Sequence, residues 1–213
     1  MENYSEILNS ASETGQIEAV RVYPNGIALI QNPTERLQLA AVSSDGLAIR
    51  SIENPSEAVK LAAVRKTYYA ISCIKEPSEA VQLAAVQNYW SAIKYIKNPS
   101  ERAMLEAIAV EPNGILYIEH PSETVQMAAV NQLPSAICCI NNPTALVQVA
   151  AVLGDKNAIS FIENPCYAAR LVAAGQYEWA MYYLPDLPSE LLAKMQDAAS
   201  NASQASSHSS VHN

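Results

Sequence analysis

Seven prolines recur in this chain at intervals of 22 residues, without a single slip. The residues around them repeat as well: Ser or Thr follows the proline in six units, an alanine stands eight residues after it, and an isoleucine stands three residues before the next proline. A fixed period of this length indicates an array of similar structural units and constrains the fold more than any other feature. The prolines are Pro33, Pro55, Pro77, Pro99, Pro121, Pro143 and Pro165.

Each unit carries the pattern of two helices. Asn-Pro-Ser-Glu, as at 54–57, predicts a helix start in which Asn caps the first amides, Pro takes the first helical position and Glu reaches back as in a capping box. We expect a first helix from Pro55 to Arg65, a short variable loop, and a second helix from Ala70 to Lys75 that the next proline ends.

The pattern extends beyond the prolines at both ends, with eight units over about 11–186 and a half unit at 187–199. One unit cannot bury its own apolar face, whereas stacked units can. We therefore predict an all-α fold, an α-solenoid of about eight 22-residue helix-pair repeats that forms a single domain over 1–199. The Ser- and Asn-rich segment 200–213 is expected to be a disordered tail.

The unit PSEAVQLAAV followed by AI and IKN, as at 77–98, resembles a short αα repeat found in hypothetical proteins of bacteriophages, giant viruses and bacteria. The resemblance covers 11–186. Tetratricopeptide, ankyrin and HEAT units are longer, and the LxxLxL strand of leucine-rich repeats is absent. That family carries no established activity, so the resemblance implies a helical solenoid, a phage origin and no catalytic residues to transfer.

Composition excludes several classes of function. A net charge of −8 argues against a general nucleic-acid binder, and no apolar stretch is long enough for a membrane helix. The N-terminus lacks the features of a secretory signal, and cysteines expected to be reduced favour the cytoplasm, of the host cell if the chain is viral. We predict no enzyme, no cofactor and no metal. The four cysteines lack zinc-site spacing, and we expect them to be reduced thiols packed as small hydrophobes: Cys73, Cys138, Cys139 and Cys166.

Charge and aromatic residues concentrate in one part of the array. Residues 50–102 hold 8 of the 13 basic and 5 of the 21 acidic residues, which leaves this stretch at +3 and the remainder at −11. Aromatic rings occupy variable positions there, where other repeats use Ser, Asp, Gly, Pro or Lys. Rings and cations at such positions are typical of binding surfaces, although local packing at the loops is the alternative. The predicted partner-binding residues are Tyr68, Tyr69, Tyr89, Trp90, Tyr95, Tyr117, Arg65, Lys66 and Lys94.

A polar column also recurs five residues after each proline, mostly as glutamine. One interpretation is hydrogen bonding between neighbouring repeats, and the other is a polar stripe that lines an exposed concave face. Its members are Gln16, Gln38, Lys60, Gln82, Met104, Gln126, Gln148 and Arg170.

The pattern favours a non-enzymatic protein-binding scaffold, because repeats build a long surface on which variable positions provide specificity. For a phage protein the partner would be a host protein, such as a defence factor that it inhibits. The alternative is a binder or sponge of small anionic ligands such as nucleotides, which would use the same basic and aromatic stretch. An uncapped solenoid end would also allow self-association into a homo-oligomer.

Overall fold

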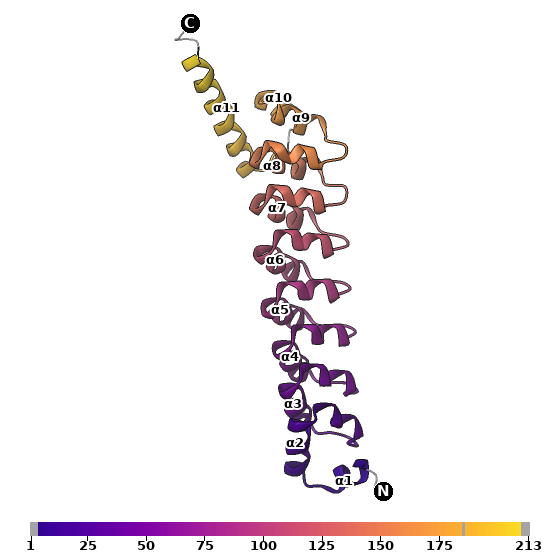
Figure 1. Ribbon diagram of the computed structural model, residues 1–213. Coiled ribbons are helices and arrows are strands. Elements are labelled where there is room, and N and C mark those ends of the chain that lie inside the picture. The colour runs from indigo at the N-terminus through magenta and orange to yellow at the C-terminus, as the bar shows by residue number, and fades with distance from the viewer. Residues whose placement is uncertain (1–3, 185, 210–213) are drawn as a thin grey trace. The chain divides into compact units, whose positions relative to one another are not determined.

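The computed structural model describes residues 4–184 and 186–209, and all of its regular elements there are helices (Figure 1). They pack consecutively against their neighbours as the predicted α-solenoid of helix pairs requires. Among the described residues, no helix combines the length and the apolar character needed to span a bilayer.

The chain divides into two compact units. The N-terminal unit is Met1–Val110 and the C-terminal unit is Glu111–Asn213, so the boundary falls within one repeat. A solenoid repeat contacts only its neighbours, so no common core holds distant repeats together, and a long array separates readily into parts.

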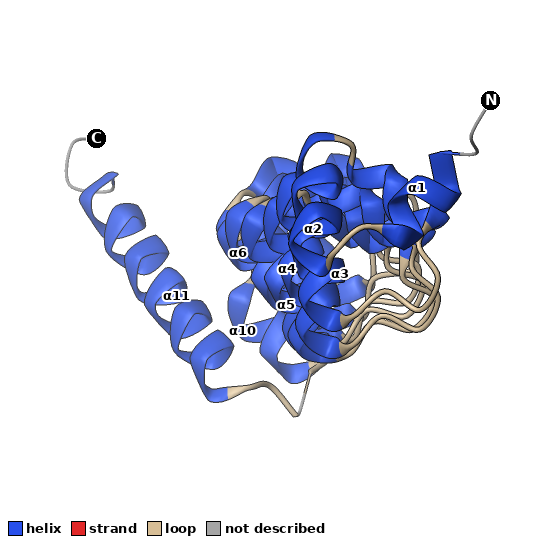
Figure 2. Ribbon diagram, turned by 90° about the horizontal axis from the view of Figure 1, so that it is seen from below, coloured by secondary structure: helices blue, strands red, loops and turns tan. Residues whose placement is uncertain are grey.

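In the N-terminal unit α-helices alternate with short 3₁₀ helices, labelled η. Seen along the stack, α2, α3, α4 and α5 lie one behind another, and the loops between repeats gather at the opposite edge (Figure 2). The elements are α1 (Tyr4–Ser10), α2 (Glu13–Val22), η1 (Pro24–Leu29), α3 (Glu35–Ser44), η2 (Gly46–Ser51), α4 (Glu57–Lys66), η3 (Tyr68–Cys73), α5 (Glu79–Asn88), η4 (Trp90–Tyr95) and α6 (Glu101–Val110).

The C-terminal unit continues the alternation and ends in α-helices only. Its last repeat pairs two short α-helices, and a longer helix follows, which packs against α10 and α8. The elements are η5 (Pro112–Tyr117), α7 (Glu123–Gln132), η6 (Pro134–Cys139), α8 (Ala145–Gly154), η7 (Lys156–Phe161), α9 (Tyr167–Ala173), α10 (Tyr177–Tyr182) and α11 (Ser189–Ser209).

The helix start differs from its prediction. Ser56, not Asn54, is the N-cap residue of α4, and its hydroxyl accepts from the Val59 amide at 3.3 Å. Pro55 lies outside the helix, and Asn54 takes the left-handed conformation with φ of 49°. A residue before proline is kept out of the right-handed helix, and asparagine tolerates positive φ better than most residues. The asparagine therefore turns the chain, and the following hydroxyl caps the helix.

The glutamate of the repeat also has another role than the one predicted. Instead of reaching back within its own helix, it accepts a hydrogen bond from the capping hydroxyl of the next repeat. Thr34 donates to Glu13 at 2.7 Å, and Ser56 and Ser78 donate in the same way to the glutamates at 35 and 57. Each of these hydroxyls is thus a cap for one helix and a link to the previous one.

The second helix of each predicted pair is a six-residue 3₁₀ helix and begins earlier than expected, η3 at Tyr68 rather than at Ala70. Only Thr67 separates it from α4. It ends at an isoleucine in extended conformation, Ile74, three residues before Pro77, so the proline does not itself end it. Runs of 3₁₀ helix are short because their hydrogen bonds are poorly aligned, and this one is long enough to turn Ala70 and Ile71 into the core.

The core repeats with the sequence. In the repeat of α4 and η3, Val59, Ala63, Val64 and Ala70 are fully buried and Ile71 is almost so. The alanine that stands eight residues after the proline is fully buried in six of the units, where its small side chain allows neighbouring helices to pack closely.

Gln82, Gln126 and Gln148 of the column are buried, and hydrogen bonding between repeats is confirmed for Gln82 and Gln148, whereas the buried Gln126 oxygen has no hydrogen-bond partner within the described residues. Gln82 is 7% exposed; its amide nitrogen donates to the Pro77 carbonyl at 3.0 Å, and its oxygen accepts from the Ser100 amide of the next repeat at 2.7 Å. Gln148 makes the same two bonds, to Pro143 and from Cys166. The interpretation as an exposed polar stripe is therefore wrong for these glutamines.

The tail prediction differs from the structure over part of its length. Helix α11 continues through Ser209, so residues 200–209 are helical, while 210–213 lie outside the described residues. Leu191 and Met195, one helical turn apart, are buried where α11 begins. The helix therefore starts from a packed first turn and extends from it into the Ser- and Ala-rich segment.

Replacing Gly46 with alanine should destabilise the protein by about 1–3 kcal/mol, because the added Cβ would lie 2.5 Å from the Ala63 carbonyl oxygen and 2.9 Å from the Thr67 Cβ. Gly26→Ala is the matched control, since nothing lies within 4 Å of its new Cβ. We expect that variant to be unchanged, or more stable by up to about 1 kcal/mol. Urea denaturation followed by circular dichroism measures both, and equal stabilities would contradict the close contact at Gly46.

Candidate partner-binding surface

Four of the predicted aromatic residues surround two junctions between an α-helix and a 3₁₀ helix, rather than lying in loops. Tyr68 and Tyr69 begin η3, Tyr89 is the residue between α5 and η4, and Trp90 begins η4. Because these junctions are so short, the rings are attached to regular backbone on both sides. Their positions are consequently better fixed than those of residues in flexible loops.

Three of the rings form a connected group. The centroids of Tyr68 and Tyr89 lie 4.9 Å apart across neighbouring repeats, and those of Tyr89 and Trp90 lie 6.1 Å apart. Both separations are in the range of favourable ring contacts. Tyr68 and Trp90 are half-buried, whereas Tyr89 is 49% exposed. This group therefore combines local packing with one ring that faces solvent.

A second group lies on η3 and η4. The rings of Tyr69 and Tyr95 meet edge to face, with centroids 4.7 Å apart. The Lys94 ammonium lies 4.8 Å from the centroid of Tyr95, which is a favourable cation–π distance. Tyr69 is 40% exposed. We call the five rings Tyr68, Tyr69, Tyr89, Trp90 and Tyr95 the aromatic surface.

Two cations stand at the end of α4, one residue before the start of this surface. Arg65 and Lys66 are exposed and form no ion pair within the described part of the chain. Asn88, at the end of α5, donates to the carbonyls of Val64 and Arg65 at 2.8 and 2.9 Å. It thereby satisfies carbonyl groups that a helix end leaves without partners and fixes the ends of α4 and α5 to each other. Sequence reasoning missed this residue; asparagine occurs at this repeat position only once.

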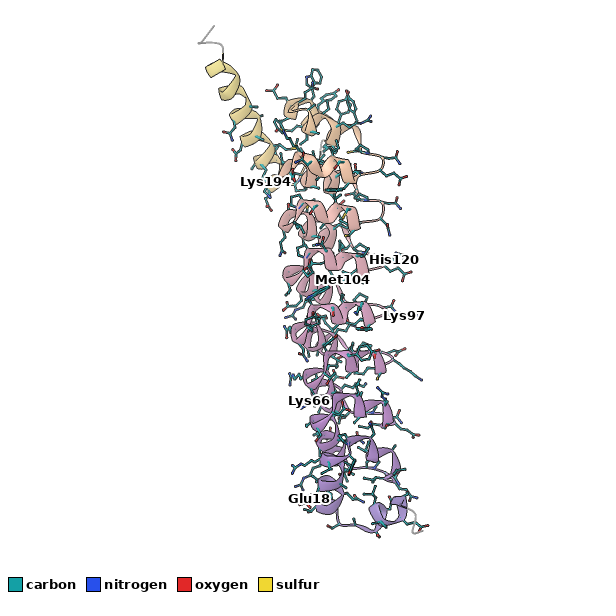
Figure 3. The ribbon with its side chains drawn as sticks, in the orientation of Figure 1. Glu18, Lys66, Lys97, Met104, His120 and Lys194 are labelled. Carbon is teal, nitrogen blue, oxygen red and sulfur yellow. The ribbon has the colours of Figure 1, made fainter. Side chains whose placement is uncertain are left out.

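The basic residues of the stretch 50–102 do not all lie on one side of the N-terminal unit. Within the N-terminal unit, Figure 3 shows Lys66 on the side of the α-helices and Lys97 on the side of the loops between repeats. Tyr117 is the last residue of η5 in the C-terminal unit and is 49% exposed, so the aromatic surface is defined without it. The basic stretch is thus contiguous in sequence but divided in space.

The loop side of the N-terminal unit carries a groove of about 690 Å³ between two repeats. Three cations line it, Arg50, Lys60 and Lys75, together with the carboxylates of Glu53 and Glu76. Lys60 is half-buried in the position that glutamine holds elsewhere. The corresponding groove of the C-terminal unit measures about 670 Å³, and its lining includes Gln148, Cys138 and Glu163 in place of these cations.

The cysteines are free and three of them are half-buried, so the prediction of thiols packed as small hydrophobes is wrong for the exposed Cys138. Cys138 is exposed and Cys139 half-buried, with their sulfurs 3.5 Å apart. Burial, and then the neighbouring Cys138, raise the pKa of the Cys139 thiol to about 11. Cys166 replaces the usual Ser as the N-cap of α9, where its sulfur accepts from the Ala169 amide at 3.4 Å. No group of three or more potential metal ligands occurs among the described residues.

Iodoacetamide at pH 8 should alkylate Cys138 well before Cys139. The thiolate is the nucleophile, and a pKa of about 11 leaves little Cys139 thiolate at that pH. The Cys139 rate should keep rising as the pH approaches 11, since the ionised fraction grows until the pKa is reached. Peptide mass spectrometry of timed wild-type samples measures both rates, and a Cys138→Ser variant should react faster at Cys139, because the neighbouring thiol contributes to the raised pKa. A Cys139 rate that levels off near pH 8 would show that its pKa is not raised.

Comparison with family models, curated proteins and solved structures finds no match for this chain. The resemblance to short αα-repeat proteins of phages and giant viruses therefore stays a prediction. Any functional conclusion has to start from the geometry of the surfaces described above.

Proposed function

We infer that the protein is a non-enzymatic binding scaffold whose aromatic surface, with Arg65 and Lys66, holds an acidic segment of a protein partner. The observation that carries the proposal is the combination of exposed rings and unpaired cations on neighbouring repeats. Tyr69 and Tyr89 are 40% and 49% exposed, although each is already fixed by contact with another ring.

Rings held in this way suit a binding hot spot. A tyrosine fixed by a neighbouring ring loses little conformational entropy when a partner covers it, so more of the contact energy remains as affinity. Interfaces accordingly concentrate their energy in a few aromatic and arginine residues. The half-buried Tyr68 and Trp90 contact the exposed Tyr89, and Tyr95 contacts the exposed Tyr69.

The charge pattern favours an acidic partner. The protein carries −8 overall, so an acidic protein is repelled by most of it. Arg65 and Lys66 supply charge of the opposite sign at the end of one helix, which would orient an acidic segment onto the rings and speed its association. If the resemblance to phage repeat proteins holds, the partner is a host protein, and a defence factor that is inhibited by being bound fits this role.

A second candidate function is the binding of a small anion in the groove between 49 and 76. The specific observation is the presence of Arg50, Lys60 and Lys75 in a groove of about 690 Å³, a volume typical of small-ligand sites. Glu53 and Glu76 offset much of this charge, so the protein partner is the leading proposal. Lys60→Gln introduces the residue that is common at this repeat position and distinguishes the two candidate functions. The variant should lose pyrophosphate binding, measured by calorimetry, and keep its binding to the protein partner unchanged.

The leading proposal predicts that the double variant Tyr69→Ser, Tyr89→Thr loses its partner while keeping its fold. Other repeats use these residues at the same positions, Ser91 and Ser135 for the first and Thr67 for the second, so the array tolerates them. Loss of about 2 kcal/mol, or roughly thirtyfold in affinity, is expected for two hot-spot rings. Immobilised protein is incubated with host lysate, and the captured proteins are quantified by mass spectrometry for the wild type and each variant.

Trp179→Ser is the matched control, because Trp179 occupies the same repeat position as Tyr69 and is 63% exposed in the C-terminal unit. A true partner is lost with the double tyrosine variant and retained with Trp179→Ser. The pair Arg65→Glu, Lys66→Glu should mainly slow association and reduce its dependence on salt. If every captured protein responds equally to the tyrosine and tryptophan variants, the aromatic surface is not the binding site.

A further inference from the structure

Two thiols stand side by side on the surface of the C-terminal unit, and neither belongs to the surface proposed above. Cys138 and Cys139 are the last two residues of η6, and their Sγ atoms lie 3.5 Å apart. Cys138 is exposed and lines the groove of about 670 Å³ between two repeats, together with Phe161. Both sulfurs are therefore able to contact one bound atom.

A disulfide bond between Cys138 and Cys139 is geometrically unfavourable. Consecutive Cα atoms are about 3.8 Å apart, whereas disulfide-linked residues usually have Cα atoms about 4.4 Å apart or more. Closing the bond would also require the sulfurs to approach from 3.5 Å, within a helical segment held by backbone hydrogen bonds. The two residues are consequently better suited to remain as a dithiol that is bridged by another atom.

The ligand set restricts what that atom is. No third His, Cys, Asp or Glu joins the pair among the described residues, so a four-coordinate structural zinc site is not formed there. An atom held by these residues has two bonds to sulfur and takes its remaining bond from its own substituent. Trivalent arsenic with one organic group has this valence and a strong preference for sulfur.

We propose that Cys138 and Cys139 form a chelating dithiol site for monosubstituted trivalent arsenicals. The reaction is a condensation: an arsonous acid, R–As(OH)₂, exchanges two As–O bonds for two As–S bonds. Each thiol proton leaves with a hydroxyl group as water, and arsenic stays trivalent. No oxidant takes part, and neither thiol has to ionise first for the overall balance to hold. The organic group extends into the groove, where the ring of Phe161 is 51% exposed.

Another repeat of the chain provides an internal control for the dithiol site. Ser72 and Cys73 hold the same two positions at the end of η3, with Oγ and Sγ 3.8 Å apart. That site has nearly the same geometry but only one thiol, so it forms only one bond to arsenic. A single As–S bond is readily exchanged with a competing thiol, whereas a chelate requires both bonds to break before the ligand leaves.

The test uses phenylarsine oxide, which hydrates to the arsonous acid, on the full chain in excess 2-mercaptoethanol, with bound equivalents counted by intact mass. The wild type should retain one equivalent, and Cys138→Ser and Cys139→Ser should each lose it. Both changes suit the fold, since Ser72 and Ser160 occupy the first position and Ser51 the second. Cys73→Ser should retain the equivalent, and Ser72→Cys should gain a second one.

Several results would contradict the proposed arsenical site. One is an adduct that survives either single serine variant, and another is a wild-type adduct mapped to Cys73 or Cys166. A Ser72→Cys variant that binds no second equivalent would also overturn it, because the geometry of the two positions would then not be what retains arsenic. Circular dichroism of each variant confirms that the fold is intact before the mass measurement.

Discussion

A side-chain hydroxyl at the helix start, as at Thr34, Ser56 and Ser78, is the link on which the stacking of the N-terminal repeats depends. The hydroxyl of Ser56 satisfies an amide of its own helix and donates to a carboxylate of the repeat before it. A buried glutamine such as Gln82 adds a second link, from its own repeat to the backbone at the next helix start. Neighbouring repeats are therefore held in register by directional bonds at the helix starts, and the apolar contacts of alanine, valine and isoleucine fill the space between. Hydrogen bonds define one angle and spacing, which apolar packing alone would leave less specific.

The period and the identity of the buried residues could be predicted from the sequence, because both depend on the spacing of side chains of one kind. The alanine and isoleucine positions that repeat every 22 residues are the ones that the structure buries. The type of the second helix could not be predicted. Six residues with an apolar pair fit an α-helical turn and a 3₁₀ turn equally well, and the one-residue connection at Thr67 is a consequence of tertiary packing. The cap was misassigned because Asn, Pro and Ser all favour helix starts, and only the positive φ of Asn54 shows which of them turns the chain.

The sequence could predict which aromatic rings of the candidate site lie close together, but not how exposed each ring is. Tyr68 and Tyr89 lie one residue short of the 22-residue period, on nearly equivalent positions of adjacent repeats, so their contact follows from the period. Their burial depends on how each ring turns against its neighbours, which no local pattern encodes. The same limit applies to the cysteines. Apolar sequence neighbours suggested packed thiols, yet Ile137 in η6 and Ile140 directly after it are buried while Cys138 faces solvent.

The left-handed asparagines have a consequence for the chemical ageing of the chain. Asparagine usually deamidates when the backbone nitrogen of the next residue attacks its side chain and forms a cyclic imide. Asn32, Asn54 and Asn142 each precede a proline, whose nitrogen carries no hydrogen and cannot react in this way. The turn residue that the repeat uses most often is thus also protected from this damage. Asn25 and Asn113 precede glycine in η1 and η5, whose nitrogens carry a hydrogen and face no side chain of their own residue, but donate to the carbonyls of Tyr23 and Glu111. Charge heterogeneity should therefore begin at these two residues when their 3₁₀ turns open.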